Sequence, residues 1–234
     1  MDRERNVKII IVAALLISVV SLSLGFAAFS NNLTIVANSD VQPLNSLKVL
    51  FSSSNVIQEE VVENIDVKLL PSGETAIYPG FTAAIPIINN SVVTAPTLSN
   101  LKATFIRPGE SVTYTLYIHN ASSYDVLLSA INFGNKACVA KTGTSQALVD
   151  QACGEIDIAV TVGGGEGESA AVTKNQNANS GSAITGHLLG ANKFETVVVT
   201  LSYADLSASG GNTDIDGDFD VTFGDVTLTY ATAS

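Results

Sequence analysis

The chain has 234 residues, of which 46% are hydrophobic and 14% charged, so it holds enough apolar material for a core and lacks the composition of a disordered protein. Its length fits one ordinary domain plus a targeting segment. The formal net charge of -11 argues against nucleic acid as a partner, because binding to phosphates requires clustered Lys and Arg.

The amino-terminal segment has the pattern of an export signal. Charged residues cluster at its start, and no charge occurs from Ile9 to Phe29. A run of about 20 apolar residues also crosses a bilayer as a helix, so residues 1–27 are predicted to be a cleaved signal peptide or a retained membrane anchor. Small residues at Gly25 and Ala27 favour cleavage between Ala27 and Ala28. Both alternatives place the rest of the chain outside the cytoplasm, at the cell surface or in the extracellular space.

Beyond residue 30 the sequence has the residue pattern expected of strands separated by turns. Short runs of β-branched residues alternate with a period of two, and Gly, Asn, Ser and Pro separate them. In the clearest run Val112, Tyr114, Leu116 and Ile118 fall on one face. Strands at such short intervals predict an all-β sandwich or barrel, formed as one domain by residues 28–234. The predicted strands are Leu33–Ala37, Lys48–Ser52, Asn64–Leu69, Ala84–Ile88, Ser111–Asn120, Val126–Phe133, Ile156–Val162, Phe194–Tyr203 and Asp218–Tyr230.

Residues 163–182 interrupt this pattern. They are rich in Gly, Asn, Ser and Ala, and Val172 is their one large aliphatic residue. We therefore predict a flexible exposed loop or an irregular hairpin tip that adds little to the core.

Cys138 and Cys153 are the only cysteines. An even number of cysteines in an exported chain predicts a disulfide, with two buried free thiols as the alternative. Closing the loop between them stabilises the fold by about 3 kcal/mol in the chain-entropy model. Ser145 is predicted to cap one short helix within the loop.

Five motifs follow one another in an order that is characteristic of one family. They read Gly25-Phe-Ala-Ala-Phe-Ser30, Leu98-Ser-Asn-Leu-Lys102, Arg107-Pro-Gly-Glu-Ser111, Tyr117-Ile-His-Asn120 and Leu127-Leu-Ser-Ala-Ile-Asn-Phe-Gly134. In order and spacing they resemble the TasA and camelysin family of Gram-positive surface and biofilm-matrix proteins. The resemblance implies a jelly-roll-like antiparallel β-sandwich, export through a dedicated signal peptidase, and assembly into matrix fibres. In such fibres the segment after the signal of one subunit completes the sheet of its neighbour.

The chain departs from this family in two respects. Residues 40–97 form a long insertion relative to the family pattern, and the cysteine pair is not a family hallmark. Extra strands from the insertion could close the sheet and keep the protein monomeric.

Residues Leu33, Thr34, Ile35, Val36 and Ala37 lie just past the predicted cleavage point. Leu33, Ile35 and Ala37 alternate with the other two, which suits a donor strand that pairs with a neighbouring subunit. The alternative is a first strand of the chain's own sandwich.

An alternating acidic run, Asp214, Asp216, Asp218 and Asp220, raises the question of calcium. The run fails the EF-hand pattern, because Phe219 stands where glycine is required. We therefore expect either a solvated acidic face or a calcium site, and no other cofactor.

The sequence offers few candidate catalytic residues. The only histidines, His119 and His187, are expected on the outer face of a strand and in a surface loop, and no zinc-protease motif or nucleophile elbow is present. We therefore predict that the chain is not an enzyme. Asn120 begins an Asn-Ala-Ser glycan acceptor pattern.

These patterns favour an exported, self-associating fibre subunit. The alternatives are a membrane-anchored, monomeric surface domain that binds a partner, and a metalloprotease resembling camelysin.

Overall fold

The computed structural model describes residues 46–54, 66–70, 80–177, 184, 186–204 and 218–233, with backbone alone for residues 66–70. All of them belong to one compact unit, Leu44–Ser234. The expected export helix, its cleavage point and the donor segment Leu33–Ala37 lie outside the described residues. Within the described part of the chain, no helix is long and apolar enough to span a bilayer.

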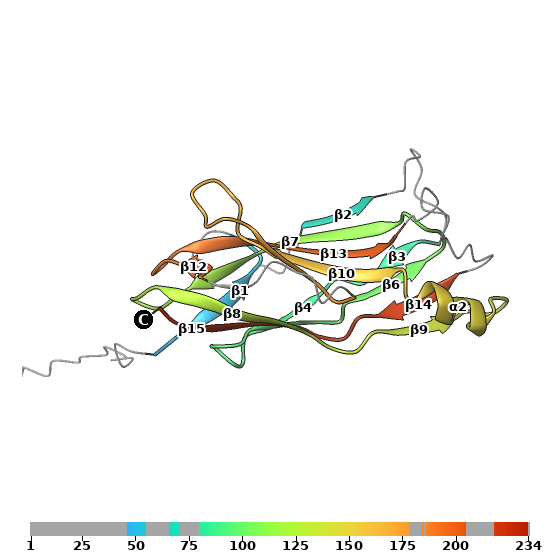
Figure 1. Ribbon diagram of the computed structural model, residues 1–234, viewed down its shortest axis with the longest axis horizontal. Helices are drawn as coiled ribbons and strands as arrows, with labels where there is room; N and C mark the ends of the chain where they lie inside the picture. The colour runs from blue at the N-terminus through green and yellow to red at the C-terminus, as the bar shows by residue number, and fades with distance from the viewer. Residues whose placement is uncertain are drawn as a thin grey trace, which may run out of the picture. The chain divides into compact units, whose positions relative to one another are not determined.

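The described secondary structure is nearly all β-strand (Figure 1). In chain order the elements are β1 (Val49–Ser52), β2 (Asp66–Leu70), β3 (Thr82–Ala83), β4 (Ile87–Asn89), β5 (Thr97–Ser99), β6 (Lys102–Phe105), β7 (Ser111–Asn120), β8 (Val126–Phe133), β9 (Ala137–Ala140), α2 (Gln146–Ala152), β10 (Ile156–Val162), β11 (Val172–Asn175), β12 (Leu188–Leu189), β13 (Phe194–Tyr203), β14 (Phe219–Thr222) and β15 (Val226–Thr232).

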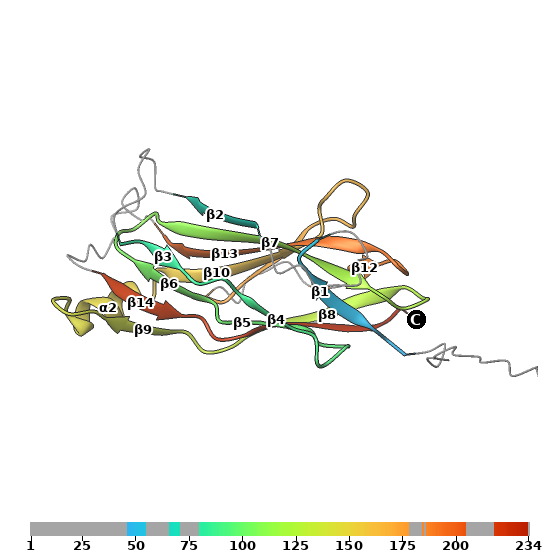
Figure 2. The same ribbon diagram turned by 180° about the vertical axis from the view of Figure 1, so that it is seen from behind.

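The strands form an antiparallel β-sandwich, which confirms the predicted fold class. The first layer has the order β1-β7-β13-β10-β11, and β2 also pairs with β7, beside β1. The second layer consists of the sheets β12-β8-β15-β5-β4 and β3-β6-β14-β9, in which β8 continues into β9 and β15 follows β14 (Figures 1 and 2). The chain crosses repeatedly from one layer to the other, as a jelly-roll-like topology requires.

The second layer breaks along one line because each of its long strands meets a residue that interrupts the ladder there. Pro86 has no amide hydrogen, while Asn100 and Gly224 adopt positive φ of 59° and 73°. A Cβ at Gly134 would lie 2.7 Å from the Asp225 nitrogen, so the close approach of the two chains requires glycine. The break lets one layer follow the twist of the other.

This break corrects two predictions. The run Ala84–Ile88 was expected to be one strand, but the chain leaves β3 and enters β4 across Pro86. The run Asp218–Tyr230 divides into β14 and β15 at Gly224 for the same reason.

The core forms because every second residue of the long strands points between the two layers. In β7 and β13 every second residue is buried between the layers, as the sequence predicts for Val112, Tyr114, Leu116 and Ile118. Each large apolar side chain buried in this way contributes about 1.5–3 kcal/mol. Aromatic rings fill one end of the core, where the Phe105 ring lies between 5.7 and 6.3 Å from three others, Phe81, Tyr203 and Phe219.

Residues 107–110 form a turn before β7, and Glu110 holds it closed. Gly109 has φ of 89° and its amide donates to the Tyr203 carbonyl at 2.6 Å. The Glu110 carboxylate accepts the Ile106 and Arg107 amides at 2.6 and 3.1 Å. Burial raises the pKa of this carboxyl, although both backbone hydrogen bonds act to lower it.

The predicted loop 163–182 contains a strand that the composition did not reveal. β11 pairs with β10, and Val172 packs opposite Val162. The segment is thus largely a hairpin arm, and residues 178–183 lie outside the described part of the chain.

Candidate functional site

The predicted disulfide is confirmed, and it fastens α2 beside β9. Cys138 lies in β9 and Cys153 follows the last residue of α2, with their Cα atoms 6.0 Å apart. Ser145 is the N-cap as predicted, but its side chain makes no capping hydrogen bond. Its carbonyl instead accepts the Leu148 and Val149 amides, both at 3.1 Å.

α2 covers the edge of β9 with a side-chain amide. The Gln146 Nε2 donates to the Cys138 carbonyl at 3.1 Å, and its Oε1 accepts the Ala140 amide at 2.8 Å. The amide therefore replaces the hydrogen bonds that a further strand would make. An edge satisfied in this way is a poor template for pairing with another chain.

Asn90 closes the edge of β1 in the same manner. Its Oδ1 accepts the Phe51 amide at 2.8 Å and its Nδ2 donates to the Phe51 carbonyl at 3.0 Å. The Val49 amide donates to the Val93 carbonyl at 2.7 Å. These bonds join the first layer to the second on this side of the sandwich.

On the opposite side of the sandwich, long polar side chains join the two layers. Lys174 follows Thr173 in β11, and its Nζ donates to the Ile131 carbonyl of β8 at 2.9 Å. The Gln176 Nε2 donates to the Gly134 carbonyl at 2.6 Å. Lys136 completes this side by donating to the Ile156 carbonyl of β10.

The edge formed by β3 and β4 differs from these three. Among the described strands β3 pairs with β6 alone and β4 with β5 alone. Ile85 and Ile87 flank this edge and are 61% and 57% exposed, and Val92 and Val93 of the following turn are also exposed. An edge strand bordered by exposed aliphatic side chains is a strong candidate for pairing with another chain. We call this region the β3–β4 edge.

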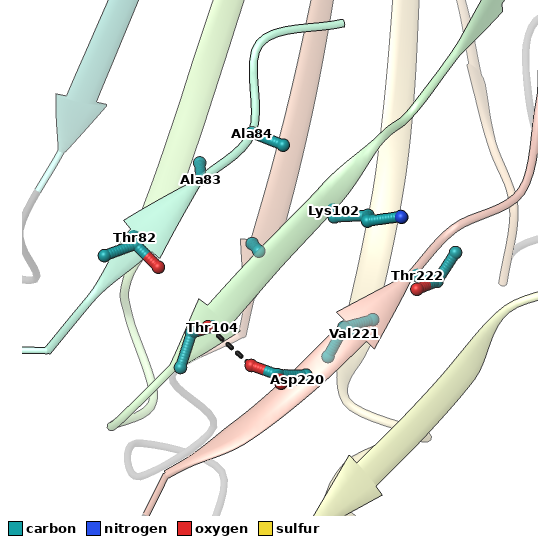
Figure 3. A pocket seen from close by; sticks show the side chains of 9 residues that line it. Thr82, Ala83, Ala84, Lys102, Thr104, Asp220, Val221 and Thr222 are labelled. Atoms are coloured by element: carbon teal, nitrogen blue, oxygen red, sulfur yellow. Dashed lines mark hydrogen bonds between the residues drawn. The ribbon is translucent and has the colours of Figure 1, made fainter.

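A shallow groove of about 390 Å³ lies next to this edge, over β3, β6 and β14 (Figure 3). Its outward side chains include Thr82, Lys102, Thr104 and Asp220. The Thr104 Oγ1 donates to the Asp220 Oδ1 at 2.6 Å, as the dashed line in the figure marks. The groove is lined by three threonines, one ammonium and one carboxylate, together with three alanines and Val221.

Two of the four aspartates of the acidic run lie within the described residues. Asp214 and Asp216 lie outside the described residues, and Asp218 and Asp220 share the ammonium of Lys141 at 3.4 and 3.6 Å. In the described part of the chain no group of His, Cys, Asp and Glu side chains is arranged to hold a metal ion. A calcium site involving all four carboxylates stays a prediction.

His187 is not the surface residue that the sequence suggested. It is buried between the layers, and its Nε2 lies 3.0 Å from the Oε2 of buried Glu195. The hydrogen bond to Glu195 raises the pKa of His187 more than burial lowers it. Tyr230 is buried near this pair, and burial raises the pKa of its hydroxyl. The sequence did not reveal the pair, because Glu195 lies inside a strand whose other inward residues are apolar.

His119 lies on the outer face of β7, as predicted. Its ring stacks on that of Phe194 with centroids 4.2 Å apart and planes inclined by 9°. Burial lowers the pKa of His119, and Lys48 lowers it further. Because one histidine faces outward from the first layer and the other lies inside the sandwich, they do not form one site.

Asn120 is a structural residue and not an accessible glycan acceptor. Its side chain is fully buried and its Nδ2 lies 2.8, 3.2 and 3.1 Å from the carbonyls of Tyr124, Leu189 and Gly190. It thus ties the end of β7 to the loop that follows it and to the end of β12.

No protein-family model and no curated protein matches the chain. Among solved structures, it has a likeness to TmCBM61 in complex with β-1,4-galactotriose, at 10% sequence identity and a TM-score of 0.22. The match covers 70% of this chain and 95% of that one. A TM-score this low does not establish a shared fold.

Proposed function

We propose that the protein is an exported structural subunit that assembles into extracellular fibres by strand addition. The segment Leu33–Ala37 of one copy pairs with the β3–β4 edge of the next. The observation that carries this proposal is that β3 and β4 each pair on one side alone among the described strands and are bordered by exposed aliphatic side chains, whereas Asn90 and Gln146 bond to the backbone on the free sides of β1 and β9.

The energetics favour such an addition. A donor strand buries two large aliphatic side chains, Leu33 and Ile35, at about 1.5–3 kcal/mol each. Each hydrogen bond of the new ladder adds about 1 kcal/mol. Repetition from copy to copy is a head-to-tail contact that does not close, which produces a filament.

Two features support export and a non-catalytic role. The disulfide between Cys138 and Cys153 is typical of proteins that fold in an oxidising compartment. The histidines occupy separate places, and His187 is hydrogen bonded within the core. The resemblance to the TasA and camelysin family supports export and assembly into fibres.

Deletion of Asn31 to Asn38 tests the proposal. We expect the shortened protein to keep the circular dichroism and thermal transition of the native sandwich but to form no fibres in electron micrographs. Fibres of native appearance from the deleted protein would exclude Leu33–Ala37 as the donor strand.

The groove over β3, β6 and β14 supports a second candidate, a membrane-anchored monomeric domain that binds a partner. The intact mass of material released by the native cell separates the two. Cleavage before Ala28 releases subunits for fibres, whereas a retained anchor holds the domain at the membrane. A camelysin-like protease is tested by casein cleavage that chelator removes and zinc restores.

A further inference from the structure

Lys136 and Asn177 meet on the side of the sandwich where β8 passes into β9. The Lys136 Nζ lies 2.8 Å from the Asn177 Oδ1, although the two residues are 41 positions apart in the sequence. A carbon–oxygen double bond is about 1.23 Å long, so the Nζ lies within about 4.0 Å of the Asn177 Cγ. A further approach to about 3.5 Å brings the amine into attacking distance of this carbonyl carbon.

Backbone carbonyls hold both side chains in place. The Asn177 Nδ2 donates to the carbonyls of Gly154 and Ile156 at 3.1 and 2.6 Å. The Lys136 Nζ donates to the same Ile156 carbonyl. One oxygen atom therefore gathers the two nitrogens, and the amide presents its Oδ1 to the amine because its Nδ2 faces the backbone.

The surroundings of Lys136 favour the neutral form of its amine. The side chain is half-buried, and this burial lowers the pKa of Lys136 more than the nearby Asp157 raises it. A neutral amine has the free electron pair that an ammonium group lacks, and a desolvated lysine is for this reason an effective nucleophile.

The carboxylate of Asp157 lies beside the same two groups. Its Oδ1 accepts the Asn177 backbone amide at 2.9 Å and the Ile158 amide at 2.8 Å, and its charge acts on Lys136. A carboxylate close to both an amine and an amide can carry a proton from one to the other.

We propose that Lys136 and Asn177 join in an intramolecular isopeptide bond. The neutral Nζ attacks the Asn177 Cγ, so that a bond between Nζ and Cγ forms and the bond between Cγ and Nδ2 breaks. One proton passes from Nζ through the Asp157 carboxylate to Nδ2, which leaves as ammonia. The carbonyls that accept from Nδ2 stabilise the positive charge that builds up on the departing nitrogen. The reaction needs no oxidant and no co-reactant, because folding alone brings its groups together.

The bond fastens the connection between β8 and β9, in the second layer, to the end of β11 at the edge of the first. It is separate from the β3–β4 edge and does not depend on strand addition. Because it links residues 41 positions apart, it restricts the unfolded chain as a disulfide does, but it survives reduction.

Mass spectrometry of the reduced, denatured full chain tests the bond. We expect the native protein to lack the mass of one ammonia, and a proteolytic digest to contain one branched peptide that joins Lys136 to Asn177. On a reducing denaturing gel the looped native chain should migrate faster than an uncross-linked variant. A folded native protein with an intact Asn177 amide and no branched peptide would overturn the proposal.

Lys136→Arg is the decisive variant, because a guanidinium keeps the charge and the hydrogen-bond donors but is not a nucleophile. We expect it to fold, to keep the full mass and to melt at a lower temperature than the native protein. The matched control is Lys174→Arg. Lys174 is also a half-buried lysine on this side, but its Nζ donates to the Ile131 backbone carbonyl and has no amide to attack, so the cross-link should stay complete. Loss of ammonia that persists in Lys136→Arg would arise elsewhere in the chain and contradict the proposal.

Asp157→Asn tests the path of the proton. The asparagine keeps an oxygen for the Ile158 and Asn177 amides but carries no proton, so the cross-link should accumulate about a hundredfold more slowly after synthesis. Cross-linking at the native rate in this variant would remove Asp157 from the reaction. Fibres in electron micrographs report on strand addition alone, so failure of that proposal leaves the mass measurement to decide this one.

Discussion

At the scale of single residues, polar side chains hold strands and loops together by hydrogen bonds to the backbone. Asn90 and Gln146 each bond to a backbone amide and a backbone carbonyl of a strand that lacks a further partner. Asn120 donates to a carbonyl of the loop that follows β7 and to one of β12. A buried polar group left without its partners costs about 1–3 kcal/mol, so the fully buried Asn120 is expected to tolerate substitution poorly.

The buried pair of His187 and Glu195 makes stability depend on pH. Because the folded protein raises the pKa of His187 above its usual 6.5, the protonated form favours the folded state. This stabilisation is fully present below pH 6.5 and is lost as the pH rises through the folded-state pKa. We expect His187→Gln to abolish that part of the pH dependence when urea unfolding is followed from acid to alkaline buffer.

His119 provides the control for this measurement. The folded protein lowers its pKa, so its protonation opposes folding, and its effect appears as the pH falls through 6.5. His119→Gln should therefore change the profile in the opposite sense. A His187→Gln protein whose pH profile matches the native one would show that the pair has no part in stability.

At the scale of elements, the strand edges differ in how they are protected. We expect Ile87→Lys to reduce fibre formation by more than about tenfold, because a charged side chain on an edge strand disfavours pairing with another chain. The matched control is Val139→Lys. Val139 is 59% exposed, close to the 57% of Ile87, but lies in β9, whose edge Gln146 occupies.

Thioflavin fluorescence and pelleting of fibres measure both variants. Equal inhibition by Ile87→Lys and Val139→Lys would indicate that added positive charge, and not the edge, controls assembly. Normal fibres from Ile87→Lys would remove the β3–β4 edge as the acceptor.

Long alternating runs predicted the strands more accurately than short runs did. Long alternating runs such as Ser111–Asn120 and Phe194–Tyr203 coincide with β7 and β13, because inward and outward faces alternate along a strand regardless of its neighbours. The short runs did not predict the bounds of their strands. Pro86 and Gly224 divide two of them, and Val172 begins a strand within a polar segment, because the partner strands decide where a ladder continues.

At the scale of the whole molecule, net charge opposes the proposed assembly. Copies with a net charge of -11 repel, and the Debye length is about 10 Å at 0.1 M salt and about 3 Å at 1 M. We therefore expect fibre formation, followed by light scattering, to accelerate with added sodium chloride and to level off near 1 M. Slower assembly in salt would mean that attraction between opposite charges drives it.

The sequence alone determined the class of fold, the disulfide, the short helix beginning after Ser145 and the face on which each residue of the long strands lies. These properties depend on composition, spacing and periodicity, which act along the chain. The tertiary structure alone decided that His187 is buried against Glu195, that Asn90 and Gln146 close strand edges, and that the β3–β4 edge is left unpaired among the described strands. Each of these requires residues far apart in the sequence to meet, and only the packing of the two layers brings them together.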